Sequence, residues 1–182
     1  MKTVFSLTAA AMMALSGSVS AASAFSLSSA DIPADFRLTQ QHVFKGFGCS
    51  GENISPQLSW RNPPAGTKSY AITVFDPDAP TGSGWWHWTM VNIPAQIHDL
   101  PTGADKKTLP TGVVQGRNDF GYAGFGGACP PPGDKPHRYQ FTVWALNTAT
   151  LPLDSESSGA LVGFMLNAHV IAKAQFTATY GR

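Results

Sequence analysis

The sequence predicts a mostly β, β-rich α+β fold with one helix near its end. Three long runs of β-branched and aromatic residues, 69–75, 86–93 and 139–146, are typical of strands. Their residues are largely apolar at both parities, as expected of central strands covered on two faces. Only residues 158–173 show a helical apolar spacing. These observations together define the fold class.

Shorter strand candidates accompany the three long runs. Residues 25–28 and 56–60 precede the first run, residues 113–115 follow the second, and residues 175–180 come last. Each segment contains large apolar residues but is too short to stand alone. We therefore expect them to extend or flank a sheet built on the long runs.

The helical segment repeats large apolar residues at three- and four-residue intervals, which is typical of an amphipathic helix. The residues of this stripe are Leu161, Phe164, Met165, Ala168 and Ile171. Short polar side chains before the segment can accept a hydrogen bond from its first turn. The cap candidates are Asp154, Ser155 and Ser157.

A glycine-rich connection lies between the second and third long runs, residues 86–93 and 139–146. Residues 112–133 contain seven glycines and, near their end, three consecutive prolines, residues 130–132. A long connection inside a compact domain is usually functional, and interleaved Tyr122 and Phe125 suggest a packed loop whose backbone approaches something closely. The alternative is a loop that covers an open sheet edge.

The first 24 residues have the pattern of a signal peptide. Lys2 is followed by an uncharged apolar run, and small residues then allow cleavage after Ala21 or Ala24. The run is too short to span a bilayer, and the alternative is a buried N-terminal helix. We expect an exported protein, periplasmic or secreted, whose residues 25–182 form a single domain.

The charge content excludes several classes of protein. Charged residues make up 13% of the 182 residues, with 12 basic against 11 acidic side chains. So few charges argue against a disordered chain or a long coiled coil. Without the signal peptide the balance is zero, which leaves no global field for binding a nucleic acid.

Cys49 and Cys129 are the two cysteines of the chain. In an oxidising compartment an isolated pair most simply forms one disulfide, and two free buried thiols are the alternative. Without further cysteines, a zinc ribbon or a thioredoxin-like centre is not expected.

Polar side chains gather at the ends of the three long runs. Asp76 and Asp78 follow the first run, His87 lies in the second, and His137 and Tyr139 open the third. Imidazole and phenol groups can donate to an anion, while a carboxylate can accept from an imidazole and favour its protonation. If the runs are neighbours, these side chains form a local anion site. Each residue taken alone also has a structural reading, as a turn or a buried core side chain.

Other chemistries have less support in the sequence. There is no nucleophile elbow, phosphate-binding loop, zinc-protease motif or dinucleotide fingerprint. The same Asp and His residues could ligate a divalent metal, but no compact ligand motif requires it. We expect neither a metal nor a cofactor.

The chain resembles the phosphatidylethanolamine-binding proteins. The resemblance covers the chain from Phe25 onward and rests on residues 76–80, 86–88, 122–131 and 136–139. Residues 46–49, 116–121 and 158–161 are similar to the bacterial Raf-kinase-inhibitor-like branch, in its exported, periplasmic form. Where eukaryotic members have a glycine before the paired prolines, this chain has Cys129.

The resemblance implies a large central antiparallel sheet, a smaller second sheet and a C-terminal helix. It also implies a small pocket for phosphate-like groups. By position in the motifs, Asp76, Asp78, His87, His137 and Tyr139 are the implied pocket residues. Pro80, Cys129, Pro130 and Pro131 are implied at its rim.

The expected function is non-catalytic binding of a small anionic or phosphorylated ligand. One alternative is a protein that inhibits a protease, a kinase or a host factor through its surface. A weaker alternative is a hydrolase that uses Asp78 and His87 as acid and base. The bacterial relatives suggest a homodimer, and no nucleic-acid partner is expected.

Overall fold

The computed structural model describes residues 23–105 and 107–182. Five strands form a central antiparallel sheet in the order β10-β9-β5-β6-β8. The three long predicted runs are its β5 (Ser69–Asp76), β6 (Trp85–Pro94) and β9 (His137–Leu146). The edge strands are β8 (Val114–Gln115) and β10 (Val170–Tyr180). The mostly β fold class is confirmed.

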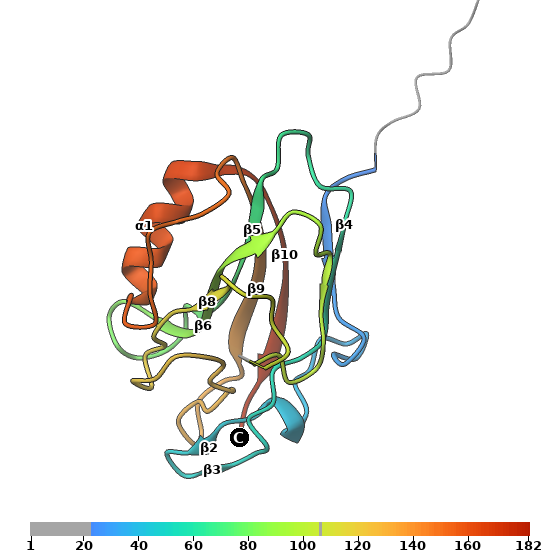
Figure 1. The fold of residues 1–182 in the computed structure, drawn as a ribbon. Coiled ribbons are helices and arrows are strands. Elements are labelled where there is room, and N and C mark those ends of the chain that lie inside the picture. The colour runs from blue at the N-terminus through green and yellow to red at the C-terminus, as the bar shows by residue number, and fades with distance from the viewer. Residues whose placement is uncertain (1–22, 106) are drawn as a thin grey trace, which may run out of the picture.

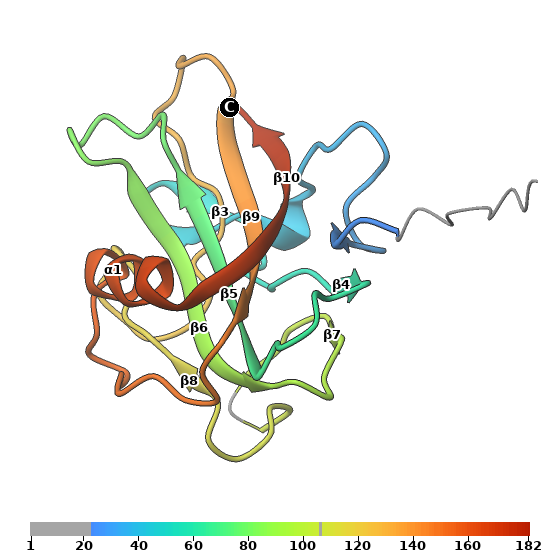
Figure 2. The same cartoon turned by 90° about the horizontal axis from the view of Figure 1, so that it is seen from above.

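Each face of the central sheet is covered by a different element, and Figures 1 and 2 show the sheet between the helix and the smaller sheet. The smaller sheet has the strand order β1-β4-β7. Its strands are β1 (Ser26–Ser28), β4 (Leu58–Arg61) and β7 (Asp99–Leu100). The helix α1 (Gly159–His169) packs on the opposite face.

Alternate residues of β5 enter two separate cores. Tyr70 and Ile72 pack with Trp60 of β4, whereas Ala71 packs with Val162 of α1. A strand covered on both faces has no solvent side on which to place polar residues. This arrangement explains why the long runs are apolar at both parities.

The predicted helix is too long at its C-terminal end. The helix ends at His169, and β10 begins directly at Val170, where the sequence analysis expected helix up to residue 173. The segment from Val170 to Tyr180 pairs with β9 over nearly its whole length. Pairing along this sheet edge therefore replaces the last helical turn.

The predicted apolar stripe of the helix faces mainly outward. Leu161 and Phe164 are 46% and 72% exposed, whereas the buried positions include Val162 and Leu166. Gly159 explains this orientation, because a Cβ atom there would lie 2.1 Å from the Trp86 ring. The helix face with Gly159, Val162 and Leu166 packs on the sheet, and Leu161 and Phe164 are turned to solvent.

The helix cap also differs from the three candidates. The Ser158 hydroxyl accepts a hydrogen bond from the Leu161 N–H at 3.3 Å. Ser157 and Asp154 bond to each other instead, with the Ser157 hydroxyl 2.9 Å from the Asp154 carboxylate. Asp154, Ser155 and Ser157 therefore belong to the turn before the helix rather than to its cap.

Two small elements complete the fold. A short 3-10 helix, η1, spans Gln40–His42, and the two-stranded hairpin β2 (Lys45–Gly46) and β3 (Cys49–Ser50) follows it. They are not predictable from the sequence, because segments of two or three residues carry no readable periodicity.

The glycine-rich loop lies against the segment around η1, as its composition predicts. The Phe44 N–H donates to the Ala128 carbonyl at 2.9 Å. A Cβ atom on Gly127 would lie 2.5 Å from the His42 carbonyl oxygen, so only glycine fits this contact.

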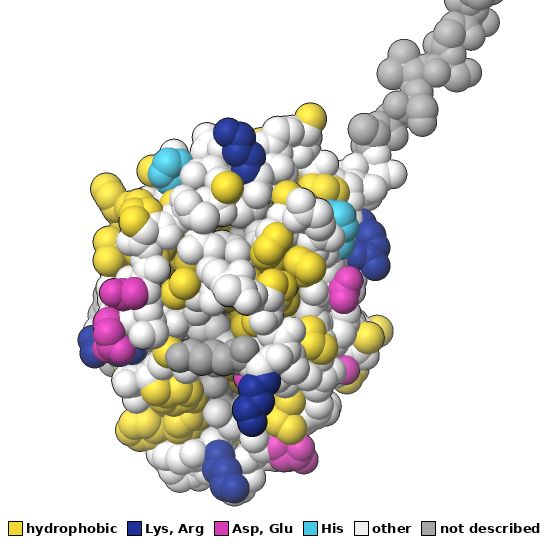
Figure 3. Space-filling view, viewed as in Figure 1, with side chains coloured by type: hydrophobic (Ala, Val, Ile, Leu, Met, Phe, Trp, Pro, Cys, Tyr) yellow, Lys and Arg dark blue, Asp and Glu magenta, His cyan; other side chains and the backbone are white. Residues whose placement is uncertain are grey.

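Charged side chains are sparse and dispersed on the face shown in Figure 3. Among the described residues, no helix is long and apolar enough to cross a membrane. The predicted signal peptide, residues 1–24, lies outside the described residues except for its last two positions.

Candidate functional site

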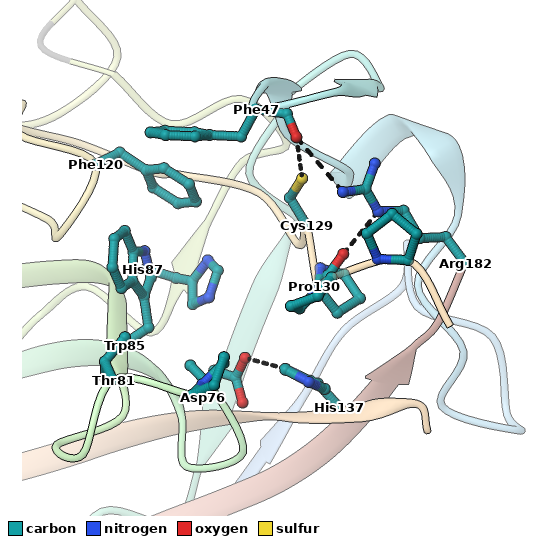
Figure 4. Close-up of a pocket in the computed structure, with 14 residues that line it drawn as sticks. Phe47, Asp76, Thr81, Trp85, His87, Phe120, Cys129, Pro130, His137 and Arg182 are labelled. Carbon is teal, nitrogen blue, oxygen red and sulfur yellow. Dashed lines mark hydrogen bonds and ion pairs between the residues drawn. The ribbon is translucent and has the colours of Figure 1, made fainter. Parts of the chain in front are cut away.

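A cavity of about 390 Å³ opens at one end of the central strands. Because neighbouring strands are antiparallel, the C-terminal end of β5 lies beside the N-terminal ends of β6 and β9 there. Asp76, His87 and His137 come from these three strand ends and reach the same cavity (Figure 4). The strands are thus neighbours, as the anion-site hypothesis required.

Asp76 and His137 form a buried carboxylate–imidazole pair on one side of the cavity. The Asp76 carboxylate lies 2.7 Å from His137 Nδ1, and both residues are about 97% buried. On the other side of the ring, His137 Nε2 lies 3.3 Å from the carboxylate of Asp134. Both contacts can be hydrogen bonds donated by the ring only when it is protonated. The second Asp76 oxygen accepts the Asp78 N–H at 2.8 Å.

His87 projects into the cavity from β6 (Figure 4). Its Nδ1 lies 2.8 Å from the Gly126 carbonyl oxygen, so Nδ1 carries a proton and donates it. Burial lowers the pKa of His87, and the Gly126 hydrogen bond and the Asp76 charge oppose that effect only in part. In the neutral ring Nε2 therefore has a lone pair, and it becomes a donor only on protonation.

Asp78 does not line the cavity. Its carboxylate accepts hydrogen bonds from the Arg138 guanidinium at 2.8 and 2.9 Å and from the Arg138 N–H at 2.9 Å. This Arg138 contact, by its side-chain hydrogen bonds above all, lowers the pKa of Asp78 to about 2. Asp78 is therefore an ion-pair partner beside the site rather than a ligand group within it.

Tyr139 also lies outside the cavity lining. It is 1% exposed and packs edge-on against His87, with ring centroids 5.1 Å apart. Burial raises the pKa of its hydroxyl, which has no hydrogen-bond partner among the described residues. Tyr139 thus packs against the His87 ring outside the cavity lining. The expectation that its hydroxyl reaches an anion does not fit this position.

The remaining predicted residues do line the cavity. They are Pro80, Cys129, Pro130 and Pro131. Cys129 is joined to Cys49 in a disulfide, with a Cα–Cα distance of 6.0 Å. The bond connects β3 to the proline segment at the rim of the cavity.

The aromatic side of the cavity and one cation are not among the predicted site residues. Phe47, Trp85, Phe120 and Arg182 line the cavity but were not predicted as site residues. Phe47 and Phe120 lie within motifs that carried the resemblance, which was the available signal. Nothing in the local sequence distinguishes Arg182, which reaches the cavity only because β10 ends beside the N-terminal end of β9.

The described residues offer no cluster for a metal ion. Among residues 23–105 and 107–182, no three His, Cys, Asp or Glu side chains come together as a possible metal site. In the cavity Asp76 pairs with His137 instead, and His87 bonds to the Gly126 carbonyl.

Comparisons with known proteins agree with this architecture. The family model described as phosphatidylethanolamine-binding protein matches residues 30–181. YbcL of Escherichia coli strain K12 is 64% identical over 162 residues, covering 87% of this chain and 88% of YbcL. YbhB of the same strain is 51% identical over 146 residues, covering 79% of this chain and 92% of YbhB.

Solved structures support the same assignment. The crystal structure of E. coli YbcL, described as a new member of the mammalian family, has a TM-score of 0.85 and 63% identity. A homologue from Chlamydia trachomatis has a TM-score of 0.73 and 29% identity. Each match covers 87% of this chain and 98% of the other. The chain belongs to the phosphatidylethanolamine-binding protein family, with close relatives in the bacterial proteins YbcL and YbhB.

Proposed function

We propose that this protein binds a small anionic or phosphorylated ligand in the cavity at His87 and does not transform it. The observation that carries the proposal is a buried imidazole with one nitrogen satisfied and the other directed into the cavity. His87 Nδ1 donates to Gly126, which leaves Nε2 for a ligand. A bound anion next to Nε2 would favour the protonated ring.

The net charge of the cavity limits the ligand that fits. Asp76 supplies a buried carboxylate, and the guanidinium of Arg182 already donates to main-chain carbonyls. While His87 is neutral, Arg182 is the one cation in the described cavity lining that no carboxylate faces, and its hydrogen bonds hold it at the rim. Binding should bring in a proton, and affinity should fall as the pH rises through the histidine range.

The non-catalytic part of the proposal rests on the side chains that surround His87. The sulfur of Cys129 is bonded to Cys49, and the Thr81 hydroxyl donates to the Gly84 carbonyl. Neither offers a free nucleophile next to a base. We expect a screen with phosphoesters and peptides to detect no hydrolysis. Turnover that is lost in His87→Ala would support a hydrolase instead.

Calorimetry with phosphate, phosphoethanolamine and phosphotyrosine tests the ligand assignment. We expect His87→Ala and His137→Ala to weaken binding at least tenfold, roughly the value of one hydrogen bond to a charged group. His169→Ala is a matched control, since His169 lies at the far end of β9 beside Asn147. Unchanged affinity in both pocket variants would overturn the site assignment.

We also propose export to the periplasm and a homodimer. The signal-peptide pattern and the cysteine pair support export. N-terminal sequencing of the protein from a periplasmic fraction should begin after Ala21 or Ala24, and light scattering should give twice the chain mass. An uncleaved cytoplasmic protein or a monomer would contradict the respective expectation.

A second candidate function is inhibition of another protein through the outer surface. The outward face of α1 favours it, because Leu161 and Phe164 expose large apolar side chains there. Phe164→Glu should then abolish inhibition while His87→Ala leaves it intact. Inhibition that is lost in His87→Ala and kept in Phe164→Glu would mean that the cavity, and not the face of α1, carries the function.

A further inference from the structure

The cavity is larger and more apolar than a phosphate group requires. Its volume of about 390 Å³ corresponds to about a dozen water molecules and lies in the range of small-molecule sites. The polar side chains Asp76, His87 and His137 occupy one part of it. Most of the other lining residues are aromatic or proline, beside Ala79, Thr81, Cys129 and Arg182. This part of the cavity leaves space for an apolar group attached to the anion.

Three aromatic side chains form a continuous wall on that side (Figure 4). Phe120 contacts Trp85 edge-on, with ring centroids 5.3 Å apart, and Phe47 lies 5.7 Å from Phe120. Phe44 stacks behind Phe120 at 3.9 Å and fixes that ring. Phe47 also stacks on Phe44, with ring centroids 5.9 Å apart, but it is 71% exposed. It is therefore the solvent-exposed end of the wall.

Phe47 is placed by the hairpin that carries it. The residue has a φ of 51°, in the left-handed region that bulky residues rarely adopt. The hairpin itself has only two residue pairs, Lys45 with Ser50 and Gly46 with Cys49. Two such pairs are too few to hold a turn in this conformation unaided.

Two further connections fasten the hairpin to the opposite rim. The disulfide joins Cys49 to Cys129, next to Pro130 in the cavity lining. The Arg182 guanidinium donates to the Pro130 carbonyl at 2.6 Å, to that of Gly48 at 2.8 Å and to that of Phe47 at 3.4 Å. One cation and one covalent bond thus clamp the tip of the hairpin to the proline segment.

We propose that Phe47 is a specificity-determining residue for the apolar part of the ligand, and that the clamp of Arg182 and the disulfide is what positions it. The ligand class is a phosphate monoester with a flat apolar ester group, which can lie against Phe47 and Phe120. This inference rests on the proposed binding of the phosphate group at His87. Arg182 acts as a positioning residue, because each of its three nitrogens donates to a main-chain carbonyl of the rim.

The test compares two monoesters that differ only in the ester group, methyl phosphate and phenyl phosphate, by calorimetry near neutral pH. We expect the wild-type protein to prefer phenyl phosphate by about three- to tenfold beyond the effect of added area, the usual range for an aromatic pair. Phe47→Ala should abolish that preference and leave the affinity for methyl phosphate within about twofold.

Phe36→Ala is the matched control. Phe36 is also a partly exposed phenylalanine with a positive φ, 55°, but it packs on Phe176 away from the cavity. The control should retain the full preference for phenyl phosphate. An equal loss in both variants, or wild-type affinities that do not differ, would overturn the inference while the proposed function stands. Binding of neither monoester would overturn both.

The clamp is tested by the same ratio of affinities. Arg182→Ala should lower the preference for phenyl phosphate and spare methyl phosphate, and Arg182→Lys should restore part of it. Equal loss for both ligands would mean that Arg182 binds the anion directly, which contradicts a positioning role. A phosphine reductant that converts the disulfide to two thiols should act like Arg182→Ala. The Cys49→Ser/Cys129→Ser variant should show the lowered preference from the start and no further response.

Discussion

The protonation of His87 on ligand binding is the prediction with the largest expected effect. Burial lowers the pKa of the free imidazole, and an anion at Nε2 would raise it. Between those two pKa values, affinity falls tenfold for each unit of rising pH, because each binding event takes up one proton. Each tenfold step corresponds to about 1.4 kcal/mol.

Sulfate is the probe for this experiment, because its charge stays constant where that of phosphate changes. From about pH 7.5 to about pH 5.5 we expect the affinity for sulfate to rise up to about a hundredfold. Calorimetry in buffers of different ionisation enthalpy should report uptake of one proton per sulfate. In His87→Asn, whose side chain does not titrate, the affinity should vary by less than about twofold over the same range.

Two results would refute this reasoning. A pH-independent sulfate affinity in the wild-type protein would mean that the anion does not require an imidazolium. An unchanged slope in His87→Asn would place the proton on another group, such as His137 beside Asp76 and Asp134.

Three further predictions address the parts of the structure around the site. Gly159→Ala should destabilise the fold by about 1–3 kcal/mol, because its Cβ would meet Trp86 at 2.1 Å, whereas Gly163→Ala, with its nearest contact at 3.6 Å, should be neutral or stabilising. Equal urea unfolding midpoints for the two variants would contradict the close packing of Gly159 on Trp86. Tyr139→Phe removes a buried hydroxyl without a partner, so the free energy of unfolding should be unchanged or up to about 1 kcal/mol higher, and phosphate affinity should stay within about twofold. A large loss of phosphate affinity would mean that the Tyr139 hydroxyl contacts the ligand. The pKa of Asp78 is lowered to about 2 in the folded protein, so its stabilising effect is present above about pH 4 and is lost as the pH falls towards 2. Asp78→Asn should therefore lose less stability than the wild-type protein between pH 4 and pH 2, and an equal loss in both proteins would argue against the Arg138 ion pair.

The central sheet could be predicted from the sequence because its strands are long and doubly covered. Residues 69–75, 86–93 and 139–146 show the apolar composition that burial on two faces requires, and they became β5, β6 and β9. The boundary at residue 169 could not be predicted, because the residues after it suit a helix and a strand almost equally. Pairing with β9 decides the outcome, and such pairing is invisible in local sequence.

The orientation of α1 shows a different limit. The spacing of Leu161 and Phe164 correctly indicates a helix, but the face that packs is the one with Gly159 and Gly163. Trp86 on the sheet requires a glycine directly opposite its ring, while Val162 and Leu166 pack on the same side of the helix. The largest apolar residues therefore need not mark the buried face where a large partner side chain fills the space.

The candidate site could be predicted in its polar centre and not in its surroundings. Asp76, His87 and His137 stand out by residue type at strand ends, and the cavity contains all three. Asp78 shares the same motif, yet it turns to Arg138, because alternation along an ideal strand does not persist beyond Asp76. Phe47 and Arg182 come from segments far away in the sequence, and only the three-dimensional structure brings them to the rim.

Anion binding at His87 is tested most directly by a phosphate titration followed by the ¹⁵N chemical shifts of the His87 ring near pH 7. We expect Nδ1 to keep its proton throughout, while Nε2 changes from the unprotonated to the protonated shift in proportion to saturation. A ring that stays neutral at full saturation, or a titration that leaves His87 unaffected, would contradict anion binding at this site.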